Sequence, residues 1–270
     1  MHPPYVVIHK PRGETPLGAI ERWKLERPDY APLPASYAGR LDPMAEGKLL
    51  VLLGDECRKQ KRYTKLDKEY VIEVVLDLAT DTGDVLGLPA YAAVETQPGH
   101  DAIKRALRSV LGTHRVPYPA FSSKPVGGTP LFLHALQGTL DTITIPEHDE
   151  TIYGAKLLGV EVVRTTGLEE RITSALSIVP RSAEPSKALG ADFRQDVIRA
   201  GWRALFSLTP ERSFMVFKVR VRCASGTYMR TLASRLAKSF GTTGLTLSIT
   251  RTKIGMYRKI GPFGFWVRSY

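Results

Sequence analysis

One aspartate stands in a turn-forming stretch just before an apolar run. Asp42 lies in the sequence GRLDP, which ends at Pro43, and leucine and valine fill residues 49–53. Gly39 can adopt backbone angles that other residues avoid, and the proline fixes the exit from the turn. Such a turn can aim a carboxylate into a cleft. Aspartate before proline more often only caps a turn, so the pattern leaves both interpretations open.

Three further stretches hold residues that could work with such a carboxylate. Tyr70 opens the strand-like KEYVIEV, where ordinary sheet packing is the alternative. Arg230 lies in SGTYMRTL on the first turn of a predicted helix, where the helix dipole disfavours a cation. Its position suggests pairing with a carboxylate, and a solvated surface arginine is the alternative. The basic strand ITRTKIGMYRK, residues 249–259, also fits a solvated face.

The hydrophobic pattern predicts the elements that must position these residues. Apolar and β-branched runs predict strands, and residues 244–257 read as a last pair of strands. Helical spacing with capping residues predicts helices, the first with Thr15 as N-cap and Pro16 at its first position. The predicted strands are 5–8, 70–76, 153–163 and 213–226, and the predicted helices are 15–26, 100–112 and 227–241, with a short helix ending the loop 117–138.

Strands outnumber helices in this reading, and successive strands look hairpin-connected. The pattern therefore predicts an α+β fold with a mixed, mostly antiparallel central sheet flanked by helices. Residues 166–213 interrupt the pattern. We interpret them as an insertion with a Pro/Ser/Ala-rich segment at 179–190 and a helix at 191–208.

Composition narrows the class of protein. The chain has 270 residues, 43% of them hydrophobic, which suffices for a real core. A net charge of +11 favours a polyanionic partner, RNA or DNA, although a basic solvated surface gives the same number. Strand-like sequence starts at Tyr5, and no apolar run approaches the roughly 20 residues of a membrane span. We therefore expect a cytoplasmic protein that binds no membrane, with an organellar location left open.

Two cysteines, Cys57 and Cys223, are too few for a disulfide framework, and no Cys/His group has zinc spacing. The absence of such a ligand cluster predicts no metal site.

Taken together and in order, these stretches resemble the TruB-type pseudouridine synthases, which isomerise a uridine in the T-loop of transfer RNA. The resemblance covers nearly the whole chain, and six motifs in the right order make chance an unlikely source. The motifs are VVIHKPRGETPLGAIERWK, GRLDPMAEGKLLVLLGDECRK, KEYVIEVVLDLATDTGDVLG, PYPAFSSKPVGGTPLFLHALQG, SGTYMRTL and ITRTKIGMY.

The resemblance implies a role for several residues. Asp42 matches the catalytic aspartate, which acts at the glycosidic carbon of the ribose after the base has been flipped out of its RNA. Tyr70 matches the tyrosine that stacks on the uracil, and Arg230 matches the arginine that pairs with the aspartate. Further substrate-binding residues implied by the matched motifs are Lys10, Arg40, Lys68, Ile249 and Arg251. The resemblance also implies that neither a metal nor an organic cofactor is needed.

The chain also departs from the family pattern. Tyr37 stands where the family has a histidine that fills the space of the flipped base. An aromatic side chain could do the same, and a different RNA substrate is the alternative. The family's C-terminal RNA-binding PUA module has no counterpart, so we expect one catalytic domain over residues 1–270, with the insertion at 166–213. Basic residues of the insertion could replace the lost RNA contacts, or decorate the surface: Arg171, Arg181, Lys187, Arg194, Arg199 and Arg203.

Two functions follow from the resemblance, and a third, a DNA-binding structural protein, has only the charge in its favour. The first is an RNA pseudouridine synthase that acts on tRNA as a monomer, with a protein partner as a possible source of missing RNA contacts. The second is an RNA-binding assembly factor or RNA chaperone that keeps the fold without depending on catalysis. Asp42, Tyr70 and Arg230 together favour the first.

Overall fold

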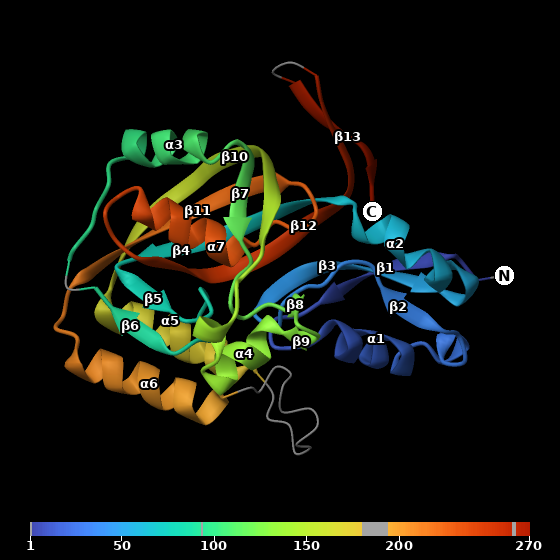
Figure 1. The fold of residues 1–270 in the computed structure, drawn as a ribbon, viewed down its shortest axis with the longest axis horizontal. Coiled ribbons are helices and arrows are strands. Elements are labelled where there is room, and N and C mark those ends of the chain that lie inside the picture. The colour runs from blue at the N-terminus through green and yellow to red at the C-terminus, as the bar shows by residue number, and fades with distance from the viewer. Residues whose placement is uncertain (1, 93, 180–193, 261–262) are drawn as a thin grey trace.

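A mixed, mostly antiparallel sheet runs through the computed structural model, which describes residues 2–92, 94–179, 194–260 and 263–270. Figure 1 shows the sheet with helices on both of its faces. The predicted α+β class is therefore confirmed. In spatial order the main strands are β1 (Tyr5–Lys10), β3 (Ala45–Leu53), β12 (Gly244–Ile260), β4 (Asp67–Leu76), β11 (Ser213–Cys223), β10 (Glu147–Arg164) and β7 (Gly112–Pro117).

Shorter strands extend this arrangement. β2 (Ala35–Tyr37) pairs with β3, and β13 (Phe263–Ser269) pairs with the end of β12. Two small two-stranded sheets stand apart, formed by β5 (Leu78–Thr80) with β6 (Pro89–Tyr91) and by β8 (Pro125–Val126) with β9 (Thr129–Pro130).

Helices cover both faces of the sheet because alternate residues of the central strands are apolar on each side. One hydrophobic cluster joins α3 and α7 to the even-numbered residues of β4, and another joins α5 and α6 to the opposite side. Helix α1 packs on β1 and β3. The helices are α1 (Pro16–Leu25), α2 (Gln60–Thr64), α3 (His100–Ser109), α4 (Leu131–Gln137), α5 (Thr165–Ser177), α6 (Gln195–Leu208) and α7 (Met229–Lys238).

The start of α1 follows the predicted capping pattern. The Thr15 side chain accepts a hydrogen bond from the Gly18 backbone N–H at 3.0 Å, and Pro16 is the first helical residue. The predicted helices at 100–112 and 227–241 are also present, each shorter by a few residues.

The last predicted pair of strands is wrong, because residues 244–260 form one strand, β12. Gly255 lies where the backbone of β13 comes so close that a Cβ would meet Arg268 O at 1.9 Å. This glycine therefore serves a close approach between two strands.

The expectation of hairpin-connected strands also needs correction. Strands β10 and β11 are neighbours in the sheet, yet α5 and α6 lie between them in the chain, and β3 pairs with β12 in parallel. Helix α5 was missed in the segment taken as an irregular insertion. Its buried residues Leu168, Ile172, Ala175 and Leu176 have helical spacing, which Gly167 in the first turn obscures.

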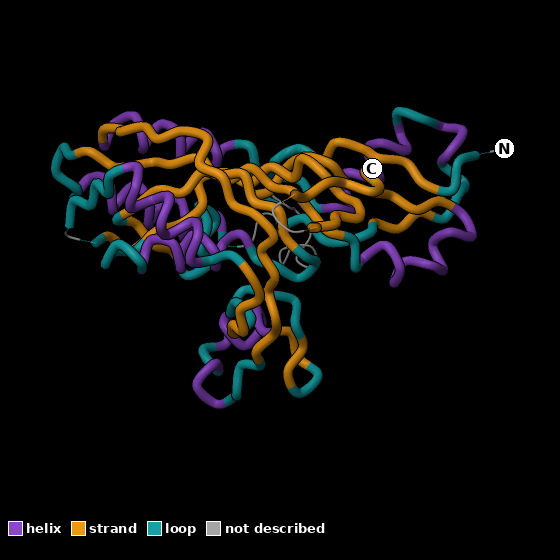
Figure 2. The backbone as a smooth tube through the Cα atoms, turned by 90° about the horizontal axis from the view of Figure 1, so that it is seen from above, coloured by secondary structure: helices purple, strands orange, loops and turns teal. Residues whose placement is uncertain are grey.

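A lobe containing α4, β8 and β9 projects from one side of the sheet. Figure 2 shows it standing out below the strands when the molecule is viewed from above. Within the described residues, no helix is long and apolar enough to cross a bilayer.

Candidate active site

A cleft of about 520 Å³ opens between the Asp42 loop, the first turn of α7 and the α4 lobe. The sheet forms its floor through side chains of β3, β4 and β12. Its volume is in the usual range for a pocket that holds a small ligand or a single nucleotide. Of the residues singled out from the sequence, six line this cleft: Arg40, Asp42, Lys68, Tyr70, Arg230 and Ile249.

The loop between β2 and β3 carries Asp42. Gly39 has φ +88°, a left-handed conformation that favours glycine. Two backbone hydrogen bonds then fix the turn: Ala45 N–H donates to Asp42 O at 2.9 Å, and Gly13 N–H donates to Pro43 O at 2.9 Å. The Asp42 side chain remains 37% exposed toward the cleft. A bound ligand can therefore reach its carboxylate.

Arg230 is the buried partner of this carboxylate. Its Nη2 lies 2.9 Å from Asp42 Oδ2, and its side chain is only 6% exposed. The guanidinium also donates to two carbonyl oxygens, from Nη1 to Thr82 O at 2.8 Å and from Nη2 to Phe121 O at 3.2 Å. Burial acts to lower the pKa of Arg230, but the carboxylates of Asp42 and Asp84 raise it above its usual value. Arg230 thus carries a fixed positive charge behind Asp42.

Asp84 is a site residue to which the sequence reasoning gave no role. It follows β5 in the TDTGD turn and is buried, with Oδ2 3.8 Å from Arg230 Nε. Its Oδ1 accepts hydrogen bonds from Thr82 Oγ1 at 2.8 Å and from Leu86 N–H at 2.9 Å. Burial raises the pKa of this carboxyl, while the Arg230 guanidinium opposes the shift. The spacing of two aspartates and two threonines in one tight turn was the available signal.

Tyr70 and Ile249 form the apolar part of the floor. They come from the neighbouring strands β4 and β12, and both are buried. Burial raises the pKa of the Tyr70 hydroxyl, so this ring stays neutral at physiological pH. A flat aromatic ring beside an aliphatic side chain provides the kind of surface on which a base can stack.

Lys68 reaches the cleft from the same strand as Tyr70. Its Nζ donates to Thr64 O at 3.0 Å and to Ser225 Oγ at 3.1 Å. Burial, with the Arg251 guanidinium nearby, lowers the pKa of Lys68 to about 8. Arg40 lies at the exposed rim of the cleft.

Three residues predicted to bind substrate do not line the cleft. Lys10 is fully buried, and its Nζ donates to Glu14 O at 2.7 Å and to Pro11 O at 2.9 Å. Arg251 is buried as well, with Nη1 donating to Arg40 O at 3.0 Å and Nε to Lys48 O at 2.7 Å. Both hold the backbone around the Asp42 loop. Tyr37 packs against the hydrophobic cluster that α1 forms with β1 and β3.

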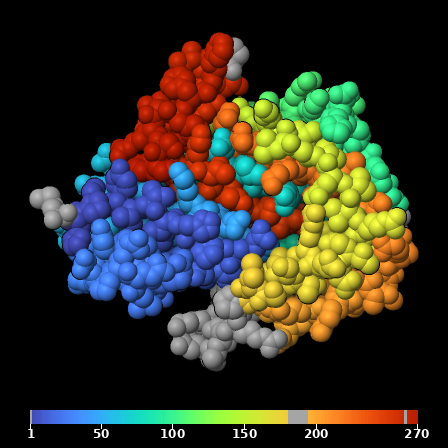
Figure 3. Space-filling model, turned by 180° about the vertical axis from the view of Figure 1, so that it is seen from behind, coloured from blue at the N-terminus to red at the C-terminus, as the bar shows by residue number. Residues whose placement is uncertain are grey.

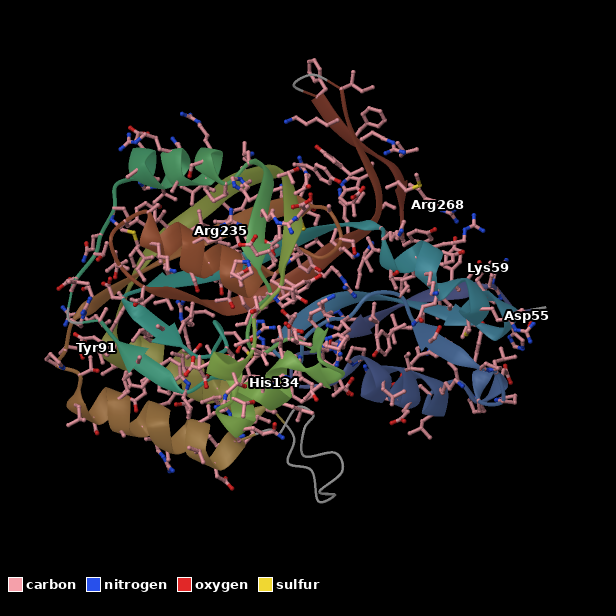
Figure 4. The ribbon with its side chains drawn as sticks, in the orientation of Figure 1. Asp55, Lys59, Tyr91, His134, Arg235 and Arg268 are labelled. Atoms are coloured by element: carbon pink, nitrogen blue, oxygen red, sulfur yellow. The ribbon has the colours of Figure 1, made fainter. Side chains whose placement is uncertain are left out.

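Glu150 fixes the first turn of α7, although no sequence pattern pointed to it. Its side chain is completely buried, and Oε1 accepts a hydrogen bond from Tyr228 N–H at 2.8 Å. Oε2 lies 3.2 Å from Nη1 of Arg235, about two turns along the same helix. Burial raises the pKa of Glu150, and the Tyr228 N–H and the neighbouring cations oppose the shift. This carboxylate satisfies a free backbone N–H at the helix start and so supports the turn that carries Arg230. Figure 4 labels Arg235 on this helix.

Within the part of the chain that the structure describes, no cluster of three or more His, Cys, Asp or Glu side chains could hold a metal ion.

The sequence model described as "TruB family pseudouridylate synthase (N terminal domain)" matches residues 32–173, just over half of the chain. The chain belongs to the TruB family. The match includes the Asp42 loop, Tyr70 and Asp84, whereas Arg230 and Ile249 lie beyond it.

Two relatives agree with this assignment. The chain is 28% identical over 255 residues to tRNA pseudouridine synthase B of Aromatoleum aromaticum, covering 93% of this chain and 63% of the relative. It is 25% identical over 251 residues to the protein of the same name from Hydrogenovibrio crunogenus, covering 93% of this chain and 64% of that one. The chain thus spans slightly less than two thirds of either relative.

A similar fold occurs in the crystal structure of a Cbf5-Nop10-Gar1 complex. The TM-score is 0.54 at 16% sequence identity, and the match covers 93% of this chain and 48% of the other. At this identity the likeness shows the fold alone.

Proposed function

We propose that this protein converts a uridine of transfer RNA to pseudouridine. The observation that carries the proposal is the half-exposed Asp42 carboxylate, held at 2.9 Å by a buried arginine above an aromatic and aliphatic floor. The names of the two TruB-family relatives supply the substrate class, tRNA. The T-loop uridine is the position that the sequence resemblance favours.

The reaction moves one bond of the base. The bond from ribose C1′ to uracil N1 breaks, the uracil turns over in the cleft, and a bond from C1′ to C5 forms. The C5 hydrogen leaves as a proton, and N1, which carries no hydrogen in uridine, takes up a proton in the product, so no electrons are gained or lost. Asp42 acts at C1′, either as a nucleophile or by stabilising an oxocarbenium-like centre.

The surrounding residues hold the reacting groups in place. Arg230 orients the Asp42 carboxylate, and Asp84 with Thr82 O limits the positions that the guanidinium can take. Tyr70 and Ile249 offer a stacking surface to the uracil while it is detached from the sugar. Extruding the base from its RNA costs a few kcal/mol, which these contacts must offset.

The test is incubation with an unmodified tRNA transcript, followed by chemical mapping of pseudouridine. We expect conversion at a single uridine of the T-loop. Conversion at a different uridine of the tRNA would keep the activity and reject the position. Binding of tRNA without any pseudouridine would reject the activity and favour an RNA chaperone.

A further inference from the structure

The end of β12 and the whole of β13 form a hairpin that stands clear of the body of the molecule. Figure 1 shows it projecting beyond the sheet, and in Figure 3 the same segment forms a separate prominence. Among the described strands, β13 pairs with β12 alone. None of the cleft-lining residues belongs to this hairpin.

The base of the hairpin is firmly held. Tyr257 is only 7% exposed, and its backbone N–H donates to Asp67 Oδ2 at 2.8 Å. The Tyr257 ring packs against Tyr153 and Trp266 at centroid distances of 5.5 and 5.3 Å. Its hydroxyl occupies the space beside Gly264, where a Cβ would not fit. The hairpin is therefore packed on one face as a continuation of the sheet.

The opposite face of the hairpin lies open to solvent. Phe263 is 75% exposed and Phe265 is 49% exposed, which is unusual for phenylalanine. The register places Ile260 opposite Phe263, and Arg258 opposite Phe265. Directly opposite residues share a face, as do alternate residues of one strand. We call the following set the hairpin face: Met256, Arg258, Ile260, Phe263, Phe265 and Arg268.

The hairpin face lies on the same side of the sheet as the cleft. Ile254 pairs with Lys68, which lines the cleft, so both side chains point to one side. Met256 and Arg258 follow Ile254 at alternate positions and thus share that side. At about 3.4 Å per residue, Arg258 lies roughly 30 Å along β12 from Ile249 in the cleft floor. A macromolecule seated in the cleft can reach this far, whereas a single nucleotide cannot.

Positively charged side chains lie between the cleft and the hairpin. Helix α2 lies between them, with Thr64 at the cleft and Tyr63 packed on Tyr270 at the base of the hairpin. Lys61, Arg62 and Lys65 of this segment are exposed, and none has an ion pair within the described residues. No Asp or Glu occurs anywhere in residues 244–270. Figure 4 labels Arg268 at the base of the hairpin and Lys59 next to α2.

We propose that the hairpin face is a second RNA-binding surface, which holds unpaired or terminal bases of the same RNA whose target uridine enters the cleft. Phe263 and Phe265 stack on bases, and Arg258 neutralises phosphate. Because the ligand is taken to be RNA, the inference rests on the proposed function. An apolar protein segment added to the open edge of β13 is the competing occupant. The cations on the face and the absence of carboxylates favour a polyanion.

The experiment compares two variants of the full chain in binding to an unmodified tRNA transcript over a range of salt concentrations. Phe263→Ala with Phe265→Ala should weaken binding by at least about fivefold, because each lost stack is worth that much. Arg258→Gln should lower the slope of log affinity against log salt by about 0.7 to 0.9, the effect of one phosphate contact. The KM for tRNA should rise in both variants, while kcat stays unchanged, because neither site contacts the cleft.

Matched controls lie on distant helices. Val197→Ala with Leu208→Ala removes two exposed apolar side chains from α6, and Arg108→Gln removes one exposed cation from α3. Both controls should bind tRNA as the wild type does, and unfolding curves should match for all variants.

The possible outcomes separate this inference from the proposed function. Hairpin variants that bind tRNA like the controls would overturn the inference, even if pseudouridine still forms. A wild-type dimer that the hairpin variants convert to a monomer with unaltered tRNA affinity would overturn it in favour of a protein-binding face. Loss of tRNA affinity in a protein that makes no pseudouridine would support the inference while rejecting the catalytic proposal.

Discussion

The contacts of the Arg230 side chain require a guanidinium group. Its planar group faces the Asp42 carboxylate, approaches Asp84 and donates to the carbonyl oxygens of Thr82 and Phe121. These partners come from three separate loops, so one side chain ties together the walls of the cleft. A lysine keeps the charge but offers one nitrogen in place of three.

Arg230→Lys should therefore lower the rate of pseudouridine formation by about a hundredfold, the effect of a small misplacement of a reacting group. The rate should be measured with tRNA in excess and again in a single turnover, so that binding and chemistry are separated. Arg105→Lys on α3 serves as the exposed control. A single-turnover rate within the error of the wild type would remove Arg230 from the positioning of Asp42.

Lys68 should make the stability of the protein depend on pH in the alkaline range. Its pKa is lowered to about 8 by burial, whereas an unfolded lysine titrates near 10.4. Between these values the unfolded state binds more protons, so the free energy of unfolding rises with pH. Below pH 8 both states are protonated and the dependence vanishes.

Lys68→Met removes this titration. Going from pH 7 to pH 9.5, the wild type should gain about 2 kcal/mol of unfolding free energy relative to the variant. Urea unfolding at the two pH values measures the difference, and the Lys10 contribution cancels because both proteins contain it. A difference that does not change with pH would show that Lys68 keeps its ordinary pKa in the folded protein.

At the scale of single residues, recognisable sequence motifs predicted which side chains contact one another. Asp42 and Arg230 are far apart in the chain, and the unusual cation at a helix start was a sign of their pairing. Lys10 and Arg251 fit the same motifs, yet their side chains turn inward to backbone carbonyls. A motif records that a residue type is needed and does not tell whether its side chain faces the ligand or the loop behind it.

Helix α6 links the core to the site at the scale of elements. Trp202 is buried, and its Nε1–H donates to Val85 O at 3.0 Å. Val85 directly follows Asp84, so this hydrogen bond holds the turn whose carboxylate faces Arg230. The segment first interpreted as an insertion thus supports the candidate active site.

Trp202→Phe keeps most of the buried ring and removes the hydrogen bond. It should cost about 1 to 3 kcal/mol of unfolding free energy, because Val85 O is left without its donor. Pseudouridine formation should also slow in the folded variant. Arg203→Ala on the exposed side of α6 should stay within about 0.5 kcal/mol of the wild type. Equal stability of Trp202→Phe and Arg203→Ala would contradict this role of α6.

Several basic residues of segment 166–213 already have partners within the protein. Arg171 pairs with Glu161, Arg194 pairs with Asp81, and Arg199 donates to Leu176 O. Arg203 is exposed, and Arg181 and Lys187 lie outside the described residues. The hypothesis that this segment supplies RNA contacts loses support, since several of its cations serve the fold. The number of charges in a sequence does not show whether they contact RNA or stabilise the fold.

For the whole molecule, the sheet is the structure that positions the site and carries the proposed second surface. The α+β class could be predicted because strand and helix patterns are strong along most of the chain. The order of the strands could not, because β3 and β12 are joined in parallel across a long stretch of sequence. The projecting hairpin was not predicted either, because residues 244–257 were divided into two strands, whereas they belong to one strand that continues to Ile260 and pairs with β13.

Part of the positive charge behind the net value of +11 can be located in this structure. Exposed cations follow α2 from the cleft toward the hairpin, on the side of the sheet that the cleft occupies. A polyanion with its target base in the cleft would lie along this side. The RNA interpretation of the composition therefore depends on where the charges are as well as on how many there are.

The central claim is that Asp42 performs the chemistry at ribose C1′. The most direct test uses Asp42→Asn, an almost isosteric change that removes the carboxylate, with tRNA carrying tritium at C5 of its uridines. Formation of the new bond at C5 releases this tritium to water. The wild type should release tritium, and the Asn variant should release none above background while it still binds tRNA. Release by the variant at the wild-type rate would contradict the account.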